Sequence, residues 1–410
     1  MKISTRIIAC LLALIMLLSF IACNSTETPQ ADPTNPSESI TETETKKPYT
    51  KITAPPTEKP TAKPLDSTAK IKNLIIIIGD GMGLAHINAG QIAEGKTYDF
   101  TTWQKSVCNT NSINSSDQEV LTDSAASATA LATGVSTKNS YLGVDKNNRE
   151  LDTILDLATL YGKSTGIVTT DYLYGATPAG FSAHSNDRNN SERITLTQAA
   201  SEVNFMCGLR NDNFYTKYYK TKLTDNGYFY STTISDEEAI LTSEKAFLPI
   251  DIENGTSLSV DLKNASALAL DFLSQNENGF VLMIEQAYID KYSHSNLVDD
   301  MLKRMKSLND TVEMVSEWAS DRDDTAIIVT ADHECGGFYS STEDEYDSSY
   351  EGVNDLYFDW TSKDHTQSMV GIFVNGAEVD FEELSLYNTA DKIRNTDVFK
   401  LMCNILKLEP

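Results

Sequence analysis

Acidic residues follow three apolar segments of the sequence, at the point where each segment ends. The segments and their acidic residues are 74–78 with Asp80, 280–284 with Glu285, and 325–330 with Asp332. In an open α/β sheet the ligand crevice lies outside the carboxyl ends of the strands, so these strands would deliver three carboxylates to one rim. Concentrated negative charge with no Lys or Arg beside it repels itself unless cations neutralise it. The pattern therefore predicts a metal site, although each acidic residue taken singly is more typical of a solvated turn or a helix cap.

Three of the chain's five histidines lie beside such acidic positions. Asp290 and His294 are spaced i, i+4, which places a carboxylate and an imidazole on one face if that turn is helical. His333 directly follows the third acidic strand end, and His365 precedes the last apolar segment. Mixed nitrogen and oxygen ligands suit zinc, and the remaining oxygen positions suit magnesium. A lone histidine is more often structural, and His86 is interpreted in that way.

A run of small residues, 123–134, carries a candidate nucleophile near its start. The pattern predicts a helix that lets another backbone or a ligand approach closely and that ends at Gly134. At the N-terminus of such a helix the dipole and the free N–H groups attract an oxyanion. Ser124 could be only the N-cap of this helix. Beside two metal ions, however, its hydroxyl would become a good nucleophile.

The elements that must position these residues alternate between strand and helix from Lys70 onward. Apolar runs suited to strands that are buried on both faces occur at 74–78, 164–170, 280–285, 325–330 and 369–374. Helical periodicity fits residues 151–161, 262–273, 297–319 and 396–406. This alternation predicts an α/β fold, a three-layer α/β/α sandwich with a large, mostly parallel central sheet. Residues 205–260, rich in Tyr, Asn and Asp, are expected to be an irregular insertion or cap of unreadable function.

The composition limits the classes of partner. The chain has 410 residues with 33 Lys and Arg against 59 Asp and Glu, a net charge of −26, so nucleic acid is not expected as a partner. With 40 % hydrophobic residues it can bury a large core, in one large domain or in two to three smaller ones. The six cysteines form no C-x-x-C pair, which indicates neither a disulfide framework nor a cysteine-based zinc finger.

The N-terminal region predicts export. Residues 1–22 have the pattern of a signal peptide, with Lys2 and Arg6 before an apolar run that is shorter than the roughly 20 residues of a spanning helix. The run ends at Phe-Ile-Ala-Cys23, which resembles a bacterial lipobox, in which Cys23 would receive the lipid. An ordinary cleaved signal with an incidental cysteine is the alternative.

The segment that follows is suited to a tether. Residues 23–69 contain eight of the eleven prolines and almost no large apolar residues, so we expect a lipid-anchored, disordered, Pro/Thr-rich linker. Residues 70–410 would then form the catalytic domain. The predicted location is the outer face of the bacterial cell membrane, as a lipoprotein, with a secreted or periplasmic protein as the alternative.

Six motifs resemble, in collinear order, the motif series of bacterial alkaline phosphatases, over residues 71 to about 405. They are 79–83 (GDGMG), 123–130 (DSAASATA), 176–179 (ATPA) with His184 and Arg188, 285–294 (EQAYIDKYSH), 331–334 (ADHE) with Gly336 and Gly337, and 365–366 (HT). The resemblance implies the alkaline-phosphatase-like sandwich and a homodimer. It also implies hydrolysis of small phosphate monoesters to an alcohol and inorganic phosphate.

The resemblance further implies a set of metal ligands, for two zinc ions and one magnesium ion. The first zinc would be held by Asp290, His294 and His365; the second by Asp80, Asp332 and His333 with Ser124; and the magnesium by Asp80, Thr177 and Glu285. In the same way, Ser124 would be the nucleophile that forms a phosphoserine. Arg188 would clamp two phosphate oxygens with its planar fork. Lys291 would contact the phosphate through water, unless it is only a surface lysine.

One departure and several alternatives accompany this interpretation. Gly175 stands where related enzymes carry Asp or His, so a thinner outer shell is expected around the magnesium. His184 and Cys335 receive no ligand role. A phosphodiesterase or a sulfatase on the same metal scaffold is disfavoured, because a diester has less need of Arg188 and sulfatases use a different motif. A catalytically idle surface lipoprotein is disfavoured because all the matched ligands are present.

Overall fold

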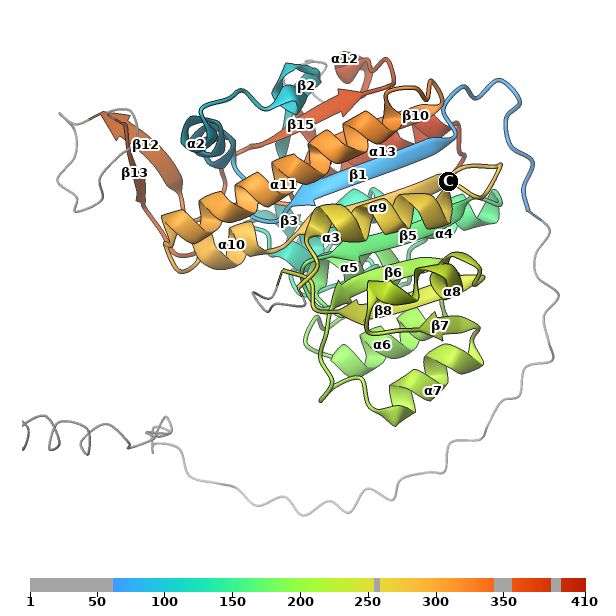
Figure 1. Cartoon of the computed structure of the whole chain (residues 1–410). Helices are drawn as coiled ribbons and strands as arrows, with labels where there is room; N and C mark the ends of the chain where they lie inside the picture. Colours follow the sequence, from blue (N-terminus) through green and yellow to red (C-terminus); the bar gives the residue numbers. More distant parts are fainter. Residues whose placement is uncertain (1–61, 254–258, 343–355, 385–391) are drawn as a thin grey trace, which may run out of the picture. The chain divides into compact units, whose positions relative to one another are not determined.

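The computed structural model describes residues 62–253, 259–342, 356–384 and 392–410. Within these residues one large sheet crosses the molecule (Figure 1). In spatial order its ten strands are β16 (Lys392–Arg394), β2 (Gln104–Asn109), β15 (Val370–Asn375), β10 (Thr325–Thr330), β1 (Asn73–Gly79), β9 (Phe280–Gln286), β5 (Ser164–Thr169), β6 (Phe205–Leu209), β8 (Lys245–Ile250) and β7 (Tyr228–Tyr230). All seven residues of β1 are buried, which explains why its sequence does not alternate between polar and apolar residues.

The sheet is mostly parallel, as predicted. From β10 through β7 each described neighbouring pair is parallel. Strand β15 is antiparallel to both of its neighbours, β10 and β2, while β16 is parallel to β2. Only β15 therefore runs against the other strands of the described sheet.

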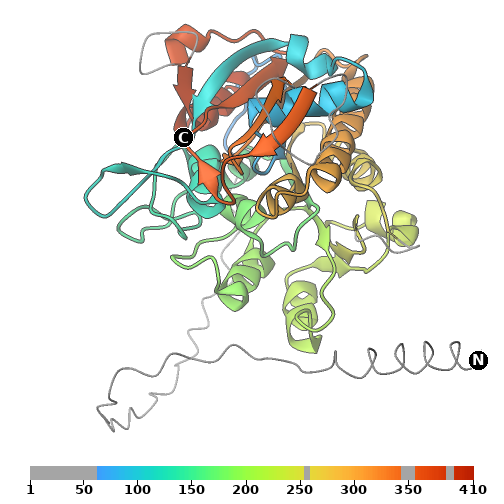
Figure 2. The same cartoon turned by 90° about the vertical axis from the view of Figure 1, so that its left-hand side faces the viewer.

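Helices cover both faces of the sheet and complete the predicted three layers (Figures 1 and 2). One face carries α2 (Leu84–Glu94), α9 (Leu262–Leu273) and α11 (Val298–Ala319), and the other carries α3 (Ser124–Thr133), α4 (Ile154–Leu160), α5 (Ala176–Ser182) and α13 (Asn395–Leu406). The remaining described helices are α6 (Ser191–Ala200), α7 (Lys217–Asp225), α8 (Glu237–Leu241), α10 (Tyr288–Ser293) and α12 (Phe381–Leu384), with 3-10 turns at Asp99–Thr102 and Ile234–Asp236. Short two-stranded ladders pair β3 (Ser112–Ile113) with β4 (Glu119–Val120), β11 (Glu334–Cys335) with β14 (His365–Thr366), and β12 (Phe338–Thr342) with β13 (Leu356–Trp360).

The long helix α11 shows how the sequence forms these layers. Met301, Met305, Leu308, Val312 and Val315 recur at helical spacing and are all buried, and the helix contacts the sheet as well as α2, α9 and α10. Acidic residues in its first turn suit the positive end of the helix dipole. An amphipathic helix of this length needs the sheet to bury its apolar stripe.

The backbones of helices α3 and α5 lie very close together where the two helices pack. All ten residues of α3 are buried. Gly180 of α5 faces Ala128 of α3 so closely that a Cβ added at Gly180 would lie 2.7 Å from the Ala128 Cβ. This confirms that the run of small residues forms a helix that another backbone approaches closely.

The expectation for residues 205–260 is wrong. Instead of an irregular insertion, the described part supplies β6, β7 and β8 to the sheet, together with α7 and α8. Strands β6 and β8 are short, and each apolar run is interrupted, by Gly208 in β6 and by Pro249 in β8. Neither run therefore matches the pattern of a buried strand.

The predicted signal peptide, Cys23 and residues 23–61 of the predicted linker lie outside the described residues. Of the helices that the structure does describe, none is both long and apolar enough to span a bilayer.

Candidate active site

The carboxyl ends of β1, β9 and β10 bring the three acidic residues to one edge of the sheet. Ile78 is the register partner of both Glu285 and Thr330, so Asp80 and Asp332 follow at nearly the same level. All three carboxylates are buried. The predicted gathering of acidic strand ends is confirmed.

The loop after β1 very closely approaches helix α10, which carries Asp290. Gly81 has φ 75° and donates its backbone N–H to Asp332 Oδ1 at 3.1 Å. A Cβ at this position would lie 2.8 Å from the Asp290 Cα. A glycine is therefore needed, both for the positive φ and for the close approach.

One group of ligand atoms consists of Asp80, Asp332 and His333. The His333 Nε2 atom lies 3.1 Å from Asp332 Oδ2, 3.5 Å from Asp80 Oδ1 and 3.1 Å from the Ser124 Oγ atom. Asp80 Oδ1 and Asp332 Oδ2 have no hydrogen-bond partner among the described residues. Burial and the neighbouring carboxylates hold the pKa of Asp80 well above its usual range. Unpartnered buried carboxylate oxygens facing an imidazole and a hydroxyl fit a bound cation.

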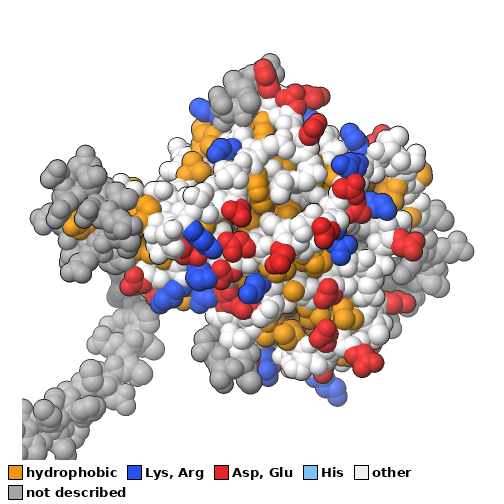
Figure 3. All heavy atoms as spheres, turned by 45° about the horizontal axis from the view of Figure 1, so that its top comes forward, with side chains coloured by type: hydrophobic (Ala, Val, Ile, Leu, Met, Phe, Trp, Pro, Cys, Tyr) orange, Lys and Arg blue, Asp and Glu red, His pale blue; other side chains and the backbone are white. Residues whose placement is uncertain are grey.

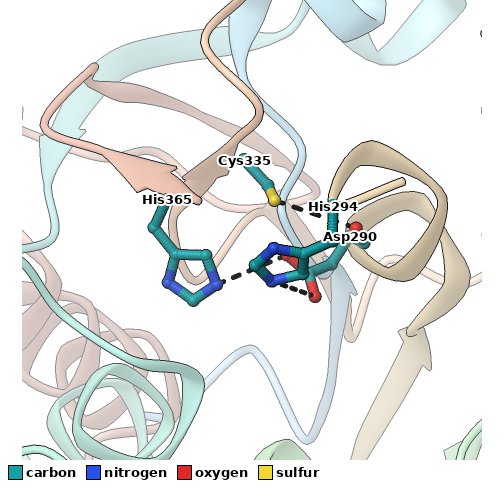
Figure 4. Close-up of side chains that lie close together, drawn as sticks. All are labelled: Asp290, His294, Cys335 and His365. Carbon is teal, nitrogen blue, oxygen red and sulfur yellow. Dashed lines mark hydrogen bonds and ion pairs between the residues drawn. The ribbon is translucent and has the colours of Figure 1, made fainter. Parts of the chain in front are cut away.

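A second group adjoins the first and contains Asp290, His294, His365 and Cys335 (Figure 4). His294 Nε2 lies 3.4 Å from Asp290 Oδ2, and His365 Nε2 lies 3.5 Å from Asp290 Oδ1, which also lacks a hydrogen-bond partner. The two groups are in contact, because the His333 and His365 rings stack with centroids 3.5 Å apart.

Backbone carbonyls orient the two imidazoles of this second group. His365 Nδ1 donates to the Thr122 carbonyl at 2.9 Å, and His294 Nδ1 donates to the Lys363 carbonyl. With Nδ1 protonated, each ring presents a free Nε2 toward Asp290, as a metal ligand must. The i, i+4 spacing of Asp290 and His294 lies in and just after α10, as expected.

Glu285 and Thr177 form the third predicted ligand set with Asp80. The Thr177 Oγ1 atom is buried at the start of α5 and has no hydrogen-bond partner among the described residues. Burial, followed by the charge of Asp171, raises the pKa of Glu285 to about 8. A buried carboxyl group and an unpartnered hydroxyl are oxygen donors, which fit a hard cation such as magnesium.

The space beside Gly175 is filled by a carboxylate that sequence reasoning missed. A Cβ at Gly175 would lie 2.6 Å from Asp171 Oδ2, so Asp171 occupies the place where a longer side chain would project. The other oxygen of Asp171 pairs with Lys291 Nζ at 2.5 Å. Lys291 also lies over the Tyr288 ring, 4.4 Å from its centroid. Lys291 is therefore ion-paired, and its side chain is 37 % exposed.

Ser124 is the first residue of α3, and Asp123 is the N-cap. Asp123 Oδ1 accepts from the Ala126 N–H at 3.0 Å, so the alternative in which Ser124 is only the cap is wrong. The other oxygen, Asp123 Oδ2, accepts from Arg188 Nη1 at 3.0 Å. Ser127 Oγ donates to the Asp332 carbonyl at 2.6 Å and so joins α3 to the end of β10. One carboxylate thus fixes both the helix start and the arginine.

The other two histidines make structural contacts. His86 Nδ1 accepts from the Gly83 N–H at 3.2 Å, and His86 Nε2 lies 3.1 Å from Ser293 Oγ. Burial lowers the pKa of His86 to about 3, so the ring is neutral. His184 Nδ1 lies 2.8 Å from the Gly143 carbonyl oxygen. Neither belongs to a candidate metal group among the described residues.

Surface charge does not by itself locate a site. On the face drawn in Figure 3, acidic and basic side chains are interspersed rather than gathered into one patch. The functional groups are identified by buried contacts instead.

The model of the alkaline phosphatase family matches residues 71–215 and 243–397. This chain belongs to the alkaline phosphatase family. Alkaline phosphatase 4 of Bacillus subtilis is 33 % identical over 308 residues, which cover 69 % of this chain and 65 % of that protein. The alkaline phosphatase of Escherichia coli is 28 % identical over 329 residues, 64 % of this chain and 70 % of that protein. The chain thus spans just under two thirds of the Bacillus alkaline phosphatase.

Solved alkaline phosphatase structures share the fold. The enzyme from the Antarctic bacterium TAB5 is 25 % identical with a TM-score of 0.72, covering 83 % of this chain and 99 % of that one. A mutant of the same enzyme, with magnesium bound in its M3 site, is 26 % identical with a TM-score of 0.73. The alkaline-phosphatase-like sandwich predicted from the motif series is confirmed.

Proposed function

We propose that this protein hydrolyses phosphate monoesters to an alcohol and inorganic phosphate, through a phosphoserine on Ser124. The observation that carries the proposal is the position of the Ser124 hydroxyl. It lies at the start of a fully buried helix, 3.1 Å from His333 Nε2, within a group in which Asp80 Oδ1 and Asp332 Oδ2 lack hydrogen-bond partners among the described residues. Membership in the alkaline phosphatase family supports the same chemistry.

The proposed cofactors are two zinc ions and one magnesium ion. Asp290, His294 and His365 would hold the first zinc; Asp80, Asp332, His333 and Ser124 the second; Asp80, Thr177 and Glu285 the magnesium. Bound cations would favour the ionised serine and neutralise charge on the phosphoryl oxygens. The unpartnered oxygens at each place support this assignment. The magnesium reported for the TAB5 mutant supports the third ion.

The chain's own residues would divide the remaining work. Ser124 Oγ would attack phosphorus and displace the alcohol, and water would then release phosphate from the phosphoserine. The positive end of the α3 dipole favours the negative charge of the phosphoryl group. Arg188, held by Asp123 beside the same helix end, would bind two non-bridging oxygens. A monoester presents those two oxygens freely and a diester does not, so the arginine supports monoesters over diesters. Lys291, ion-paired with Asp171, would contact the phosphate through water.

We also propose that the protein is a lipoprotein on the outer face of the bacterial cell membrane, anchored through Cys23. The support is the apolar run that ends at Cys23 and the proline-rich segment after it. A homodimer remains a prediction that rests on the family resemblance alone.

Acid quenching tests the reaction. Enzyme incubated with labelled phosphate and quenched in acid should retain label on the peptide that contains Ser124, because acid halts hydrolysis of the phosphoserine. Ser124→Ala should lose the label, whereas Thr133→Ala, at the far end of the same helix, should keep it. Label on another residue, or turnover without any label, would reject the phosphoserine.

Substrate comparison tests the specificity. The enzyme should turn over p-nitrophenyl phosphate much faster than bis-p-nitrophenyl phosphate or p-nitrophenyl sulfate. Faster cleavage of the diester or the sulfate would replace the proposal with one of those activities, and cleavage of none of them would favour an idle lipoprotein.

A further inference from the structure

The side chain of Cys335 lies among the residues proposed for the first zinc (Figure 4). Strand β11 pairs with β14 so that Cys335 and His365 are direct register partners in an antiparallel ladder. Residues directly opposite each other in such a ladder project on the same side. The sulfur and the imidazole therefore both reach toward α10, which carries Asp290.

The four side chains offer a compact set of donor atoms. One ligand atom from each of Asp290, His294, His365 and Cys335 can be chosen so that all lie within 4.8 Å of one another. Only 7 % of Asp290 is exposed, and its Oδ1 atom has no hydrogen-bond partner among the described residues. Cys335 is fully buried, and its backbone is fixed because its N–H donates to the Gly81 carbonyl at 3.1 Å.

The hydrogen bond of the thiol is weak enough to be exchanged. Cys335 Sγ donates to the Asp290 carbonyl oxygen at 3.8 Å, a long contact for a donor that is already a weak one. The neighbouring group of Asp80, Asp332 and His333 contains no sulfur. The two groups therefore differ in kind: one offers nitrogen and oxygen only, and the other adds a soft donor.

We propose that the sulfur of Cys335 is a fourth protein donor to the ion held by Asp290, His294 and His365. Zinc can expand from four to five ligands, so a position would remain for a phosphoryl oxygen. Binding exchanges the thiol proton for the metal, so one proton is released to solvent for each ion bound. The resulting donor set of two nitrogens, one oxygen and one sulfur selects zinc and other thiophilic divalent ions such as cadmium over magnesium. The inference rests on the metal centre of the proposed function, but not on the identity of the substrate.

Cobalt substitution tests the sulfur ligand without using activity. A thiolate bound to Co²⁺ gives an intense charge-transfer absorption in the near ultraviolet, which nitrogen and oxygen ligands do not give. Metal-free full-length protein loaded with Co²⁺ should show this band. Cys335→Ser should lose it, while Cys207→Ser, which changes a buried thiol in β6 outside the metal group, should keep it.

X-ray absorption on the zinc-loaded wild type gives a second measurement that needs no variant. A sulfur scatterer at about 2.3 Å is expected in addition to nitrogen and oxygen at about 2.0–2.1 Å. If the wild type binds metal and neither the band nor the sulfur shell is present, Cys335 is not a ligand and the proposed function stands. If the wild type binds no metal, the metal centre itself is overturned, and this inference with it.

Discussion

Replacement of Arg188 by alanine separates binding from stability. Arg188 donates a hydrogen bond from its Nη1 atom to Asp123 Oδ2, and its side chain is 33 % exposed. A partly exposed ion pair contributes at most about 1 kcal/mol to folding, so the free energy of unfolding should change little. A bidentate, charge-assisted clamp on phosphate is stronger, roughly 1.5–3 kcal/mol. We therefore expect phosphate binding to weaken by about 10- to 100-fold, since each 1.4 kcal/mol is a factor of ten.

The assay is the inhibition constant of inorganic phosphate, measured together with metal content and urea unfolding. Arg193→Ala is the matched control: Arg193 lies five residues along, donates to the His184 carbonyl, and is 51 % exposed. The inhibition constant should rise in Arg188→Ala alone, with bound zinc and unfolding close to wild type in both variants. An unchanged constant, or an equal rise in both variants, would refute the assignment of the clamp.

Three further predictions concern other parts of the chain. Cys23→Ala should release the protein from the detergent phase in phase partitioning, and unchanged membrane retention would reject the anchor. Asp123→Ala should lower the free energy of unfolding by about 1 kcal/mol through loss of the α3 cap, whereas Asp123→Asn, an equally good cap, should not; equal losses in urea unfolding would show that the cap is not responsible. Burial lowers the pKa of Lys163 from 10.5 to about 8, so its contribution to stability is present above pH 10.5 and is lost as the pH falls toward 8. In urea unfolding, Lys163→Met should reduce the change in the free energy of unfolding between about pH 8 and pH 10.5. An unchanged slope over this range would show that the burial of Lys163 is not its cause.

The central strands and the acidic edge could be predicted from the sequence for a physical reason. Parallel strands buried on both faces need continuous apolar runs, and their carboxyl ends meet at one edge. The approximate positions of Asp80, Glu285 and Asp332 could therefore be predicted from the sequence. The i, i+4 pair of Asp290 and His294 likewise needed only one helical turn.

Other features depended on contacts that no local pattern records. The carboxylate beside Gly175 comes from Asp171, four residues earlier, because the loop after β5 folds it back against Lys291. The second task of Asp123, holding Arg188, joins residues 65 positions apart. The pairing of Cys335 with His365 likewise depends on the register between β11 and β14. Short strands interrupted by Gly208 or Pro249 were missed because the sheet, rather than local propensity, stabilises them.

The contact between Gly180 and Ala128 sets a mechanical relation within the site. One helix of that contact begins with Ser124 and the other begins with Ala176 and Thr177, so the separation between nucleophile and third ligand set is governed by the volume of two very small side chains. A heavier residue at either position would move one functional group relative to the other as a rigid body. The small size of Gly180 and Ala128 thus sets the distance between the two functional groups, and added side-chain volume at either position would change that distance.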